Sequence, residues 1–198
     1  MRLAAVHGIN VGPDESVAPA WQSALRSRGM RADVTDIRWP SKGGFMSDAV
    51  AFVNPHFKAA ADEAVVHGLQ DFAHGGPGIV VAHSMGTVLA LNAERLLRTG
   101  LPILCLASPL SNPGIRPMLE AAGYGQRPRA TSIHVWNDDD PIPGGKRAEQ
   151  PSYFQAVRVA VADNEASEFA TEHAVTLYLR HPHTHAALRL LWERMDDA

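Results

Sequence analysis

The sequence predicts an α/β fold, a three-layer sandwich in which helices cover both faces of a mostly parallel sheet of six strands. One observation is that apolar, strand-like runs alternate along the chain with helical patterns, as they do where crossover helices join parallel strands. Another is size, because 198 residues, 45% hydrophobic and 20% charged, suit one sizeable core. No internal repeat or low-complexity linker interrupts the sequence. We therefore expect a single domain over residues 1–198.

The expected elements follow one another in strand and helix order. Strands are expected over residues 2–6, 32–37, 78–83, 102–107, 131–136 and 156–162. Helical patterns cover residues 17–29, 57–76 and 87–100, and each closes on glycine, a common residue at helix C-termini. Residues 40–57 and 109–130 are less regular. Since both segments follow strands, both are placed to border a pocket above the sheet.

Charge and composition exclude several classes of function. The formal net charge is −3 and the basic residues are scattered, so the sequence has no electrostatic footprint for nucleic acid. The apolar stretch before His7 is too short for a signal peptide, and no window reaches the length of a membrane span. A cytoplasmic protein without a transmembrane segment is expected. Cys105 is the only cysteine, which excludes an internal disulfide and indicates a small buried hydrophobe.

A lone serine stands where the pattern changes from strand to helix. Residues 79–81 are β-branched, as in a strand buried on both faces, and leucines recur at helical spacing over residues 89–97. Ser84 lies at the junction, with the small residues Ala82 and Gly86 two places before and after it. Such a tight turn would present the serine hydroxyl above the carboxyl end of the sheet, beside an N–H of the helix start. The alternative is a simple helix N-cap.

The stretch "AHSMG" at residues 82–86 resembles the G-x-S-x-G turn of the α/β-hydrolase superfamily, with Ala82 in place of the first glycine. The similarity covers nearly the whole chain and is to the small serine hydrolases with little cap structure, such as lipase-like and esterase-like members. It implies a reduced α/β-hydrolase fold with Ser84 as nucleophile. Residues 7–10, His-Gly-Ile-Asn, resemble the oxyanion loop, so the backbone N–H groups of Ile9 and Met85 are the implied oxyanion donors. The alternative for this segment is a glycine turn with His7 packed in the core.

The resemblance also implies an acid after the strand at residues 131–136, where the sequence reads "NDDDPIP". Asp140 is favoured because it directly precedes Pro-Ile-Pro, similar to a D-P-x-x-P arrangement in relatives, although the segment is one residue shorter. Asp138 and Asp139 remain alternatives. A run of aspartates is also common in solvated turns.

A histidine late in the chain is the implied base. His173 ends an irregular loop and precedes a helical segment, and it fits this place better than His181, His183 or His185. The order Ser84, Asp140, His173 is the order that the superfamily requires.

The implied function is hydrolysis of a carboxylic ester, or a related acyl bond, through a Ser-His-Asp triad and an acyl-enzyme. The substrate would be a small acyl compound, with esters ahead of thioesters, amides and lactones, and neither metal nor cofactor is needed. The short connections leave little chain for a cap, so an open site is expected. Two alternatives are a catalytically inactive binding module of the same fold and a zinc or nickel site on the histidines at residues 181, 183 and 185.

Overall fold

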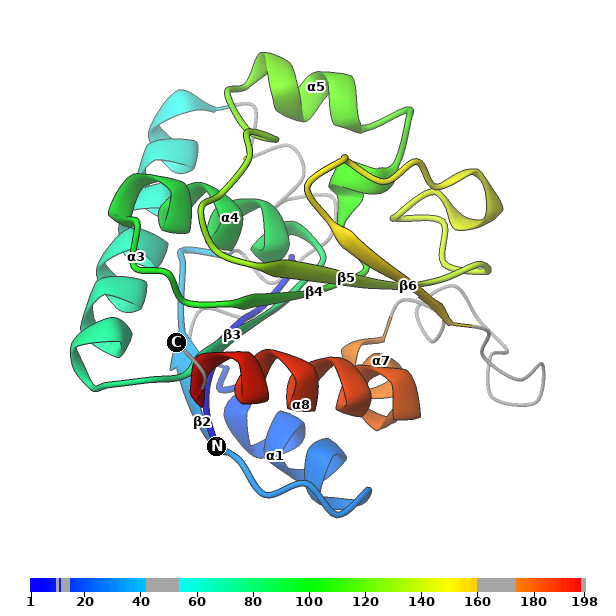
Figure 1. The fold of residues 1–198 in the computed structure, drawn as a ribbon. Coiled ribbons are helices and arrows are strands. Elements are labelled where there is room, and N and C mark those ends of the chain that lie inside the picture. The colour runs from blue at the N-terminus through cyan, green and yellow to red at the C-terminus, as the bar shows by residue number, and fades with distance from the viewer. Residues whose placement is uncertain (10, 12–14, 42–53, 160–173, 197–198) are drawn as a thin grey trace.

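A computed structural model describes residues 1–9, 11, 15–41, 54–159 and 174–196. Its centre is one sheet of six strands, all parallel, in the order β2-β1-β3-β4-β5-β6 (Figure 1). The strands are β1 (Arg2–Val6), β2 (Asp33–Ile37), β3 (Ile79–His83), β4 (Ile103–Leu106), β5 (Ser132–Asn137) and β6 (Gln155–Val159). The expected class, an α/β sandwich around a parallel sheet of six strands, is confirmed.

The sheet is covered by helices on both faces. On one face lie α3 (Pro55–His74) and α4 (Met85–Leu97), and on the other lie α1 (Ala18–Arg26), α7 (Val175–Arg180) and α8 (Pro182–Asp196) (Figure 1). Two apolar cores result, because side chains of the buried strands alternate between the two faces. Leu89 of α4 packs in the first core and Trp21 of α1 in the second.

The strand order places a topological switch point between β1 and β3. From β1 the chain passes through α1 to β2, and from β3 it passes through α4 to β4 on the opposite side. The segments that leave the two strands therefore diverge to opposite faces of the sheet. In open α/β sheets ligands bind in the crevice that forms there. The segments beginning at His7 and at Ser84 border this crevice.

Local sequence explains the two long helices beside it. Asn54 caps α3 by accepting hydrogen bonds from the backbone N–H groups of His56 and Phe57, and Pro55 occupies the first turn. The buried residues of α3 recur at helical spacing along one face: Ala61, Val65, Leu69 and Phe72. In α4 nearly every residue from 86 to 94 is buried, since this helix lies between the sheet and α3.

The observed elements match the expected ranges to within a few residues, except where the sequence was irregular. Within residues 109–130 the structure has a short 3₁₀ helix (Pro109–Ser111) and the helix α5 (Arg116–Ala121), neither of which was expected. A second 3₁₀ helix spans Gly145–Arg147. Residues 42–53 of the other irregular segment, and residues 160–162 of the last expected strand, lie outside the described residues.

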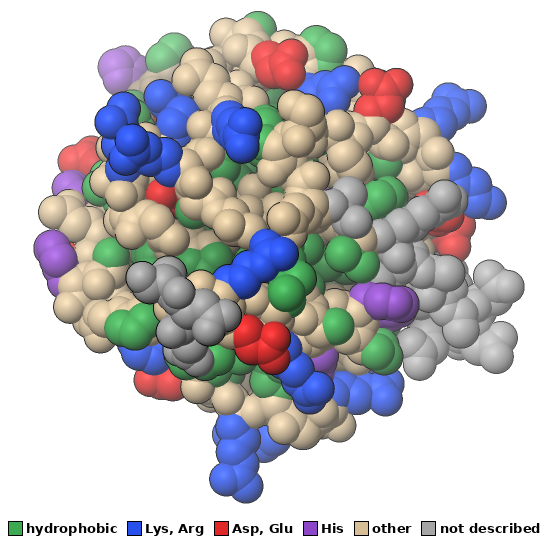
Figure 2. Space-filling view, in the orientation of Figure 1, with side chains coloured by type: hydrophobic (Ala, Val, Ile, Leu, Met, Phe, Trp, Pro, Cys, Tyr) green, Lys and Arg blue, Asp and Glu red, His purple; other side chains and the backbone are tan. Residues whose placement is uncertain are grey.

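Acidic and basic side chains are dispersed over the face shown in Figure 2, interspersed with hydrophobic ones. Cys105 is buried in β4, as expected, and burial raises the pKa of its thiol. Within the part of the chain that the structure describes, no helix combines the length and the apolar character needed to cross a bilayer.

Candidate active site

Ser84 occupies a strained turn between β3 and α4. Its backbone has φ 53° and ψ −128°, in a region that residues with a Cβ rarely adopt. The turn is held by two backbone bonds, from Ser84 N–H to the Leu106 carbonyl (2.9 Å) and from Thr87 N–H to the Ser84 carbonyl (3.0 Å). Ser84 stands at the N-cap position of α4, but its side chain makes no capping hydrogen bond. The simple N-cap interpretation is therefore wrong.

Gly86 makes this turn possible. A Cβ at this residue would lie 2.4 Å from the carbonyl oxygens of both Val6 and His7, so the start of α4 touches the backbone that leaves β1. Gly8 is also closely packed, because a Cβ there would lie 2.7 Å from Cβ of Ser84. The two glycines bring the segment after β1 directly against the serine.

The segment after β1 is held in place by contacts between His7 and Trp39. His7 is buried and stacks on Trp39 at 5.2 Å between ring centroids, while Trp39 Nε1 donates to the His7 carbonyl at 3.0 Å. His7 is thus packed, as one alternative proposed, but the loop that it begins still carries Ile9 to the cavity in front of Ser84. Ile9, Ser84 and Met85 line that cavity together.

Asp140 differs from its two neighbouring aspartates in how far its side chain is buried. Its side chain is fully buried, whereas Asp138 is half-buried and Asp139 is exposed. One carboxylate oxygen accepts the Tyr178 hydroxyl at 2.7 Å and the other accepts the Ile142 N–H at 2.9 Å.

Tyr178 links this carboxylate to the neighbourhood of the serine. Its hydroxyl also accepts the Asn137 N–H at 3.1 Å, and its ring lies 6.3 Å from that of His83, which precedes Ser84. Burial and the charge of Asp140 raise the pKa of Tyr178, so the hydroxyl stays protonated and donates to the carboxylate. No motif in the sequence indicates a role for this tyrosine.

His173, the expected base, lies outside the described residues. The three alternative histidines are described. His181 and His183 stack at 5.0 Å, and His185 is buried with Nε2 2.6 Å from the Leu179 carbonyl. Among the residues that the structure describes, no group of three or more His, Cys, Asp or Glu side chains could hold a metal ion. The zinc or nickel alternative therefore has no support from these three histidines.

The cavity in front of Ser84 has a volume of about 600 Å³. Its lining is mainly apolar, and its described members are Ile9, Pro55, Lys58, Ser84, Met85, Pro109, Ile115, Met118, Leu119, Ala121, Ala122, Tyr124 and Ile142. Volumes of this size accommodate small molecules. The unexpected helix α5 and its flanking residues form one wall of the cavity, so the irregular segment 109–130 does border a pocket, as expected.

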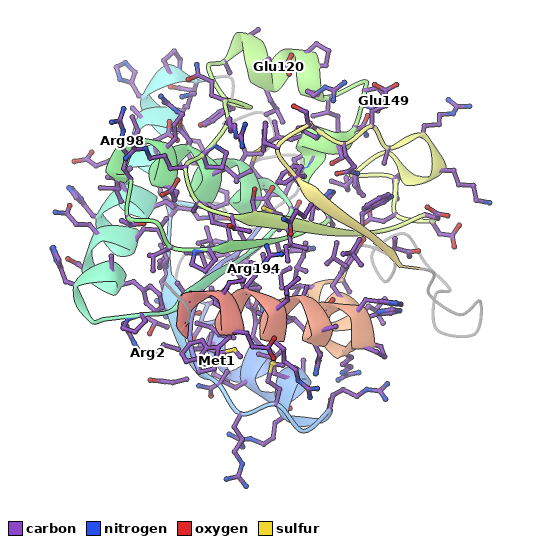
Figure 3. All side chains as sticks on the ribbon, viewed as in Figure 1. Met1, Arg2, Arg98, Glu120, Glu149 and Arg194 are labelled. Carbon is purple, nitrogen blue, oxygen red and sulfur yellow. The ribbon has the colours of Figure 1, made fainter. Side chains whose placement is uncertain are left out.

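Arg116 anchors α5 to the segment before β6. Its guanidinium lies 3.1 Å from the carboxylate of Glu149 and 3.9 Å from that of Glu120, and Figure 3 labels both glutamates. A further bond runs from Arg116 to the Glu149 carbonyl at 3.1 Å. These contacts fix one side of the cavity wall.

A buried polar network that sequence reasoning missed supports the turn at Ser84. Thr87 Oγ1 lies 2.7 Å from the Ser84 carbonyl and 2.7 Å from Ser108 Oγ. The Ser108 N–H donates to Nε2 of His134 at 2.8 Å, which leaves the ring proton on Nδ1, 2.6 Å from Oε1 of Gln150. The sequence feature that could have indicated this network is a histidine within the apolar strand at residues 131–136.

His134 is neutral in this network. Burial lowers its pKa to about 4, against the opposing effects of the Gln150 hydrogen bond and the Asp140 charge. Its fixed tautomer suits it to hold the end of β4 against β5.

No protein-family model matches the sequence, and a search of curated proteins finds no match. Solved structures do match. TT1662 from Thermus thermophilus is 13% identical, with 100% of this chain and 89% of that chain covered and a TM-score of 0.57. Est1E from Butyrivibrio proteoclasticus, solved with ferulic acid bound, is 12% identical, with 99% and 88% covered and a TM-score of 0.55. The ydeN gene product of B. subtilis is 14% identical, with 97% and 98% covered and a TM-score of 0.54.

At such low identities the similarity establishes the fold. Together with the strand order, the turn at Ser84 and the crevice beside it, it shows that this chain has the α/β-hydrolase fold that its sequence resembles.

Proposed function

We propose that the protein is a serine hydrolase that cleaves a carboxylic ester, or the related thioester, through an acyl-enzyme on Ser84. The observation that carries the proposal is the strained backbone of Ser84, whose side chain makes no capping bond and faces an apolar cavity of about 600 Å³. Strain of this kind persists only where the surrounding structure imposes it, and it is concentrated at functional sites.

In the proposed mechanism Ser84 Oγ attacks the acyl carbon while its proton passes to His173. His173 is assigned on the family resemblance alone. Asp140 orients the imidazole and balances the charge that it gains, and the buried, doubly hydrogen-bonded carboxylate supports this assignment. The backbone N–H groups of Ile9 and Met85 stabilise the oxyanion, each for about 3 kcal/mol.

The imidazolium then protonates the departing alcohol or thiol, which leaves the acyl group on Ser84. A water molecule, deprotonated by the same imidazole, attacks this acyl-enzyme and releases the carboxylic acid. All steps use groups of the chain and water.

The apolar cavity supports an acyl substrate, because its walls offer burial to hydrocarbon and few groups to pair with polar atoms. The ferulic acid bound by Est1E is a carboxylic acid, the product type of ester hydrolysis. Both points favour esters and thioesters over peptide bonds.

A fluorophosphonate probe tests the proposal, since it reacts with activated serine hydroxyls. We expect stoichiometric labelling of Ser84, found by peptide mass mapping, and hydrolysis of p-nitrophenyl hexanoate. Ser84→Ala should abolish both, and the matched variant Ser152→Ala, at an exposed turn, should retain both. If the folded protein is neither labelled nor active, the inactive binding module is the better description.

A further inference from the structure

Lys58 stands at the wall of an otherwise apolar cavity. Among the described residues that line the cavity it is the only charged one, and the other polar side chains there are Ser84 and Tyr124. Lys58 lies in the first turn of α3, and residues of α5 line the same cavity. Its side chain is 26% exposed, so the ammonium is partly withdrawn from solvent.

The ammonium is held in place by residues from several elements. Nζ lies 2.8 Å from Oδ2 of Asp62 and 4.2 Å from the ring centroid of Tyr124. Asp62 also accepts Asn92 Nδ2 of α4 at 3.1 Å and the Tyr124 hydroxyl at 3.2 Å. Burial and the Asp62 charge raise the pKa of Tyr124, so its hydroxyl remains a donor.

This arrangement differs from an ordinary ion pair on a helix surface. An exposed pair four residues apart contributes little to stability and leaves the lysine free to move. Here three donors share the Asp62 carboxylate, and the Tyr124 ring restricts the lysine, so the ammonium is preorganised at the cavity wall. Asp62 takes one of the three N–H donors that an ammonium has.

We propose that the acyl group cleaved at Ser84 ends in a carboxylate and that Lys58 binds this carboxylate. The proposal rests on the serine hydrolase function proposed above and names its substrate class, monoesters or monothioesters of dicarboxylic acids. The apolar walls enclose the methylene chain, and the bond between ammonium and carboxylate compensates the desolvation of the distal charge. Asp62 and Tyr124 act as positioning residues for Lys58.

The test compares two pairs of p-nitrophenyl esters of equal chain length, the half-ester of adipic acid with the hexanoate and the half-ester of suberic acid with the octanoate. For each pair, the measured quantity is the ratio of kcat/KM for the half-ester to kcat/KM for the alkyl ester. Lys58→Met should lower this ratio about tenfold in the better pair, by loss of one charge-assisted bond. Lys146→Met, at an exposed residue outside the cavity, removes the same charge and should leave the ratio unchanged. An unchanged ratio in Lys58→Met would overturn the proposal.

A binding measurement separates this proposal from that of catalysis. In the Ser84→Ala background, monomethyl suberate and methyl octanoate are titrated by NMR, with and without Lys58→Met. Lys58→Met should raise the Kd of monomethyl suberate about tenfold relative to that of methyl octanoate. If the unsubstituted protein hydrolyses no ester but this difference is found, the proposed catalysis fails and the carboxylate site stands. If hydrolysis is found and both ligands respond alike to Lys58→Met, the carboxylate site fails alone.

Discussion

Asp138, Asp139 and Asp140 have the same side chain in three environments. Asp140 is fully buried and bonded to Tyr178 and Ile142, whereas Asp139 is exposed. If Asp140 orients the catalytic base, Asp140→Asn should lower kcat about 10⁴-fold, because an amide stabilises the wrong tautomer of the imidazole. Steady-state hydrolysis of p-nitrophenyl hexanoate measures the effect.

Asp139→Asn serves as the matched control and should change kcat less than about threefold, as surface substitutions usually have small effects. If Asp139→Asn is inactive while Asp140→Asn is active, the assignment of Asp140 as the orienting acid is wrong. Circular dichroism spectra of both variants establish that they are folded.

At the scale of residues, the sequence was informative where chemistry and local pattern coincide. Ser84, Gly86 and Asp140 lie in short motifs beside strand ends. In the structure Ser84 and Gly86 form the tight turn that their motif predicts, and Asp140 is buried. Lys58 had no such signal, because a lysine four residues before an aspartate in an alanine-rich helix is typical of a solvated face. Its neighbour Tyr124 is 66 residues away in the chain and meets it only in the folded protein.

The turn between β3 and α4 has no room for a side chain at Gly86. Gly86→Ala adds one methyl group 2.4 Å from the carbonyl oxygens of Val6 and His7. We expect a loss of about 3 kcal/mol or more in the free energy of unfolding, because backbone must move to relieve the contact. Urea denaturation monitored by tryptophan fluorescence measures this loss.

Gly114→Ala is the control for this substitution. Its Cβ would meet only the Asn112 side chain, at 3.3 Å, at an exposed residue. The change in unfolding free energy should stay below about 1 kcal/mol. Equal stability of the two variants would mean that α4 does not pack against the segment after β1 as described.

Met118 of helix α5 lines the cavity and is also exposed to solvent. Met118 is 67% exposed and lines the cavity, so it can cover a bound acyl chain. Met118→Ser should lower kcat/KM for p-nitrophenyl octanoate about fivefold, the effect of about 1 kcal/mol of lost apolar contact. Leu96→Ser, 54% exposed on α4 and outside the cavity lining, should leave it unchanged. An equal effect of the two substitutions would exclude Met118 from substrate binding.

Among the helices and strands, hydrophobic periodicity predicted those that have long apolar patterns. β1 is the clearest case, since the expected range 2–6 and the observed strand agree at both ends. α5 was missed because its six residues include a proline and lie between turns, so no helical period can be counted. Its contacts come instead from distant segments, because Leu119 packs in the core and Arg116 pairs with Glu149.

For the whole molecule, His134 couples stability to pH. Its pKa is about 4 in the folded protein and near 6.5 in an unfolded chain. Between these values the unfolded state binds a proton that the folded state does not. Its contribution to stability is therefore fully present above pH 6.5 and is lost as the pH falls toward 4, by up to about 3 kcal/mol.

Two measurements check this coupling. The imidazole resonances of His134 in NMR spectra should titrate well below pH 6, and an ordinary midpoint near 6.5 would contradict the prediction. Urea unfolding between pH 4.5 and 7 should show a shallower pH slope in His134→Phe than in the unsubstituted protein. Phenylalanine keeps the packing against Trp136 and Phe154 while removing the titrating group.

The place of β1 in the sheet also has a consequence during synthesis. β1 is paired on both sides, with β2 and with β3, yet about 70 residues separate its end from Ile79 at the start of β3. At a translation rate of roughly 5–20 residues per second, several seconds pass between the emergence of the two strands. Throughout that interval one edge of an apolar strand has no partner from its own chain, and its open hydrogen-bonding groups are available to ribosome-associated chaperones or to other nascent chains.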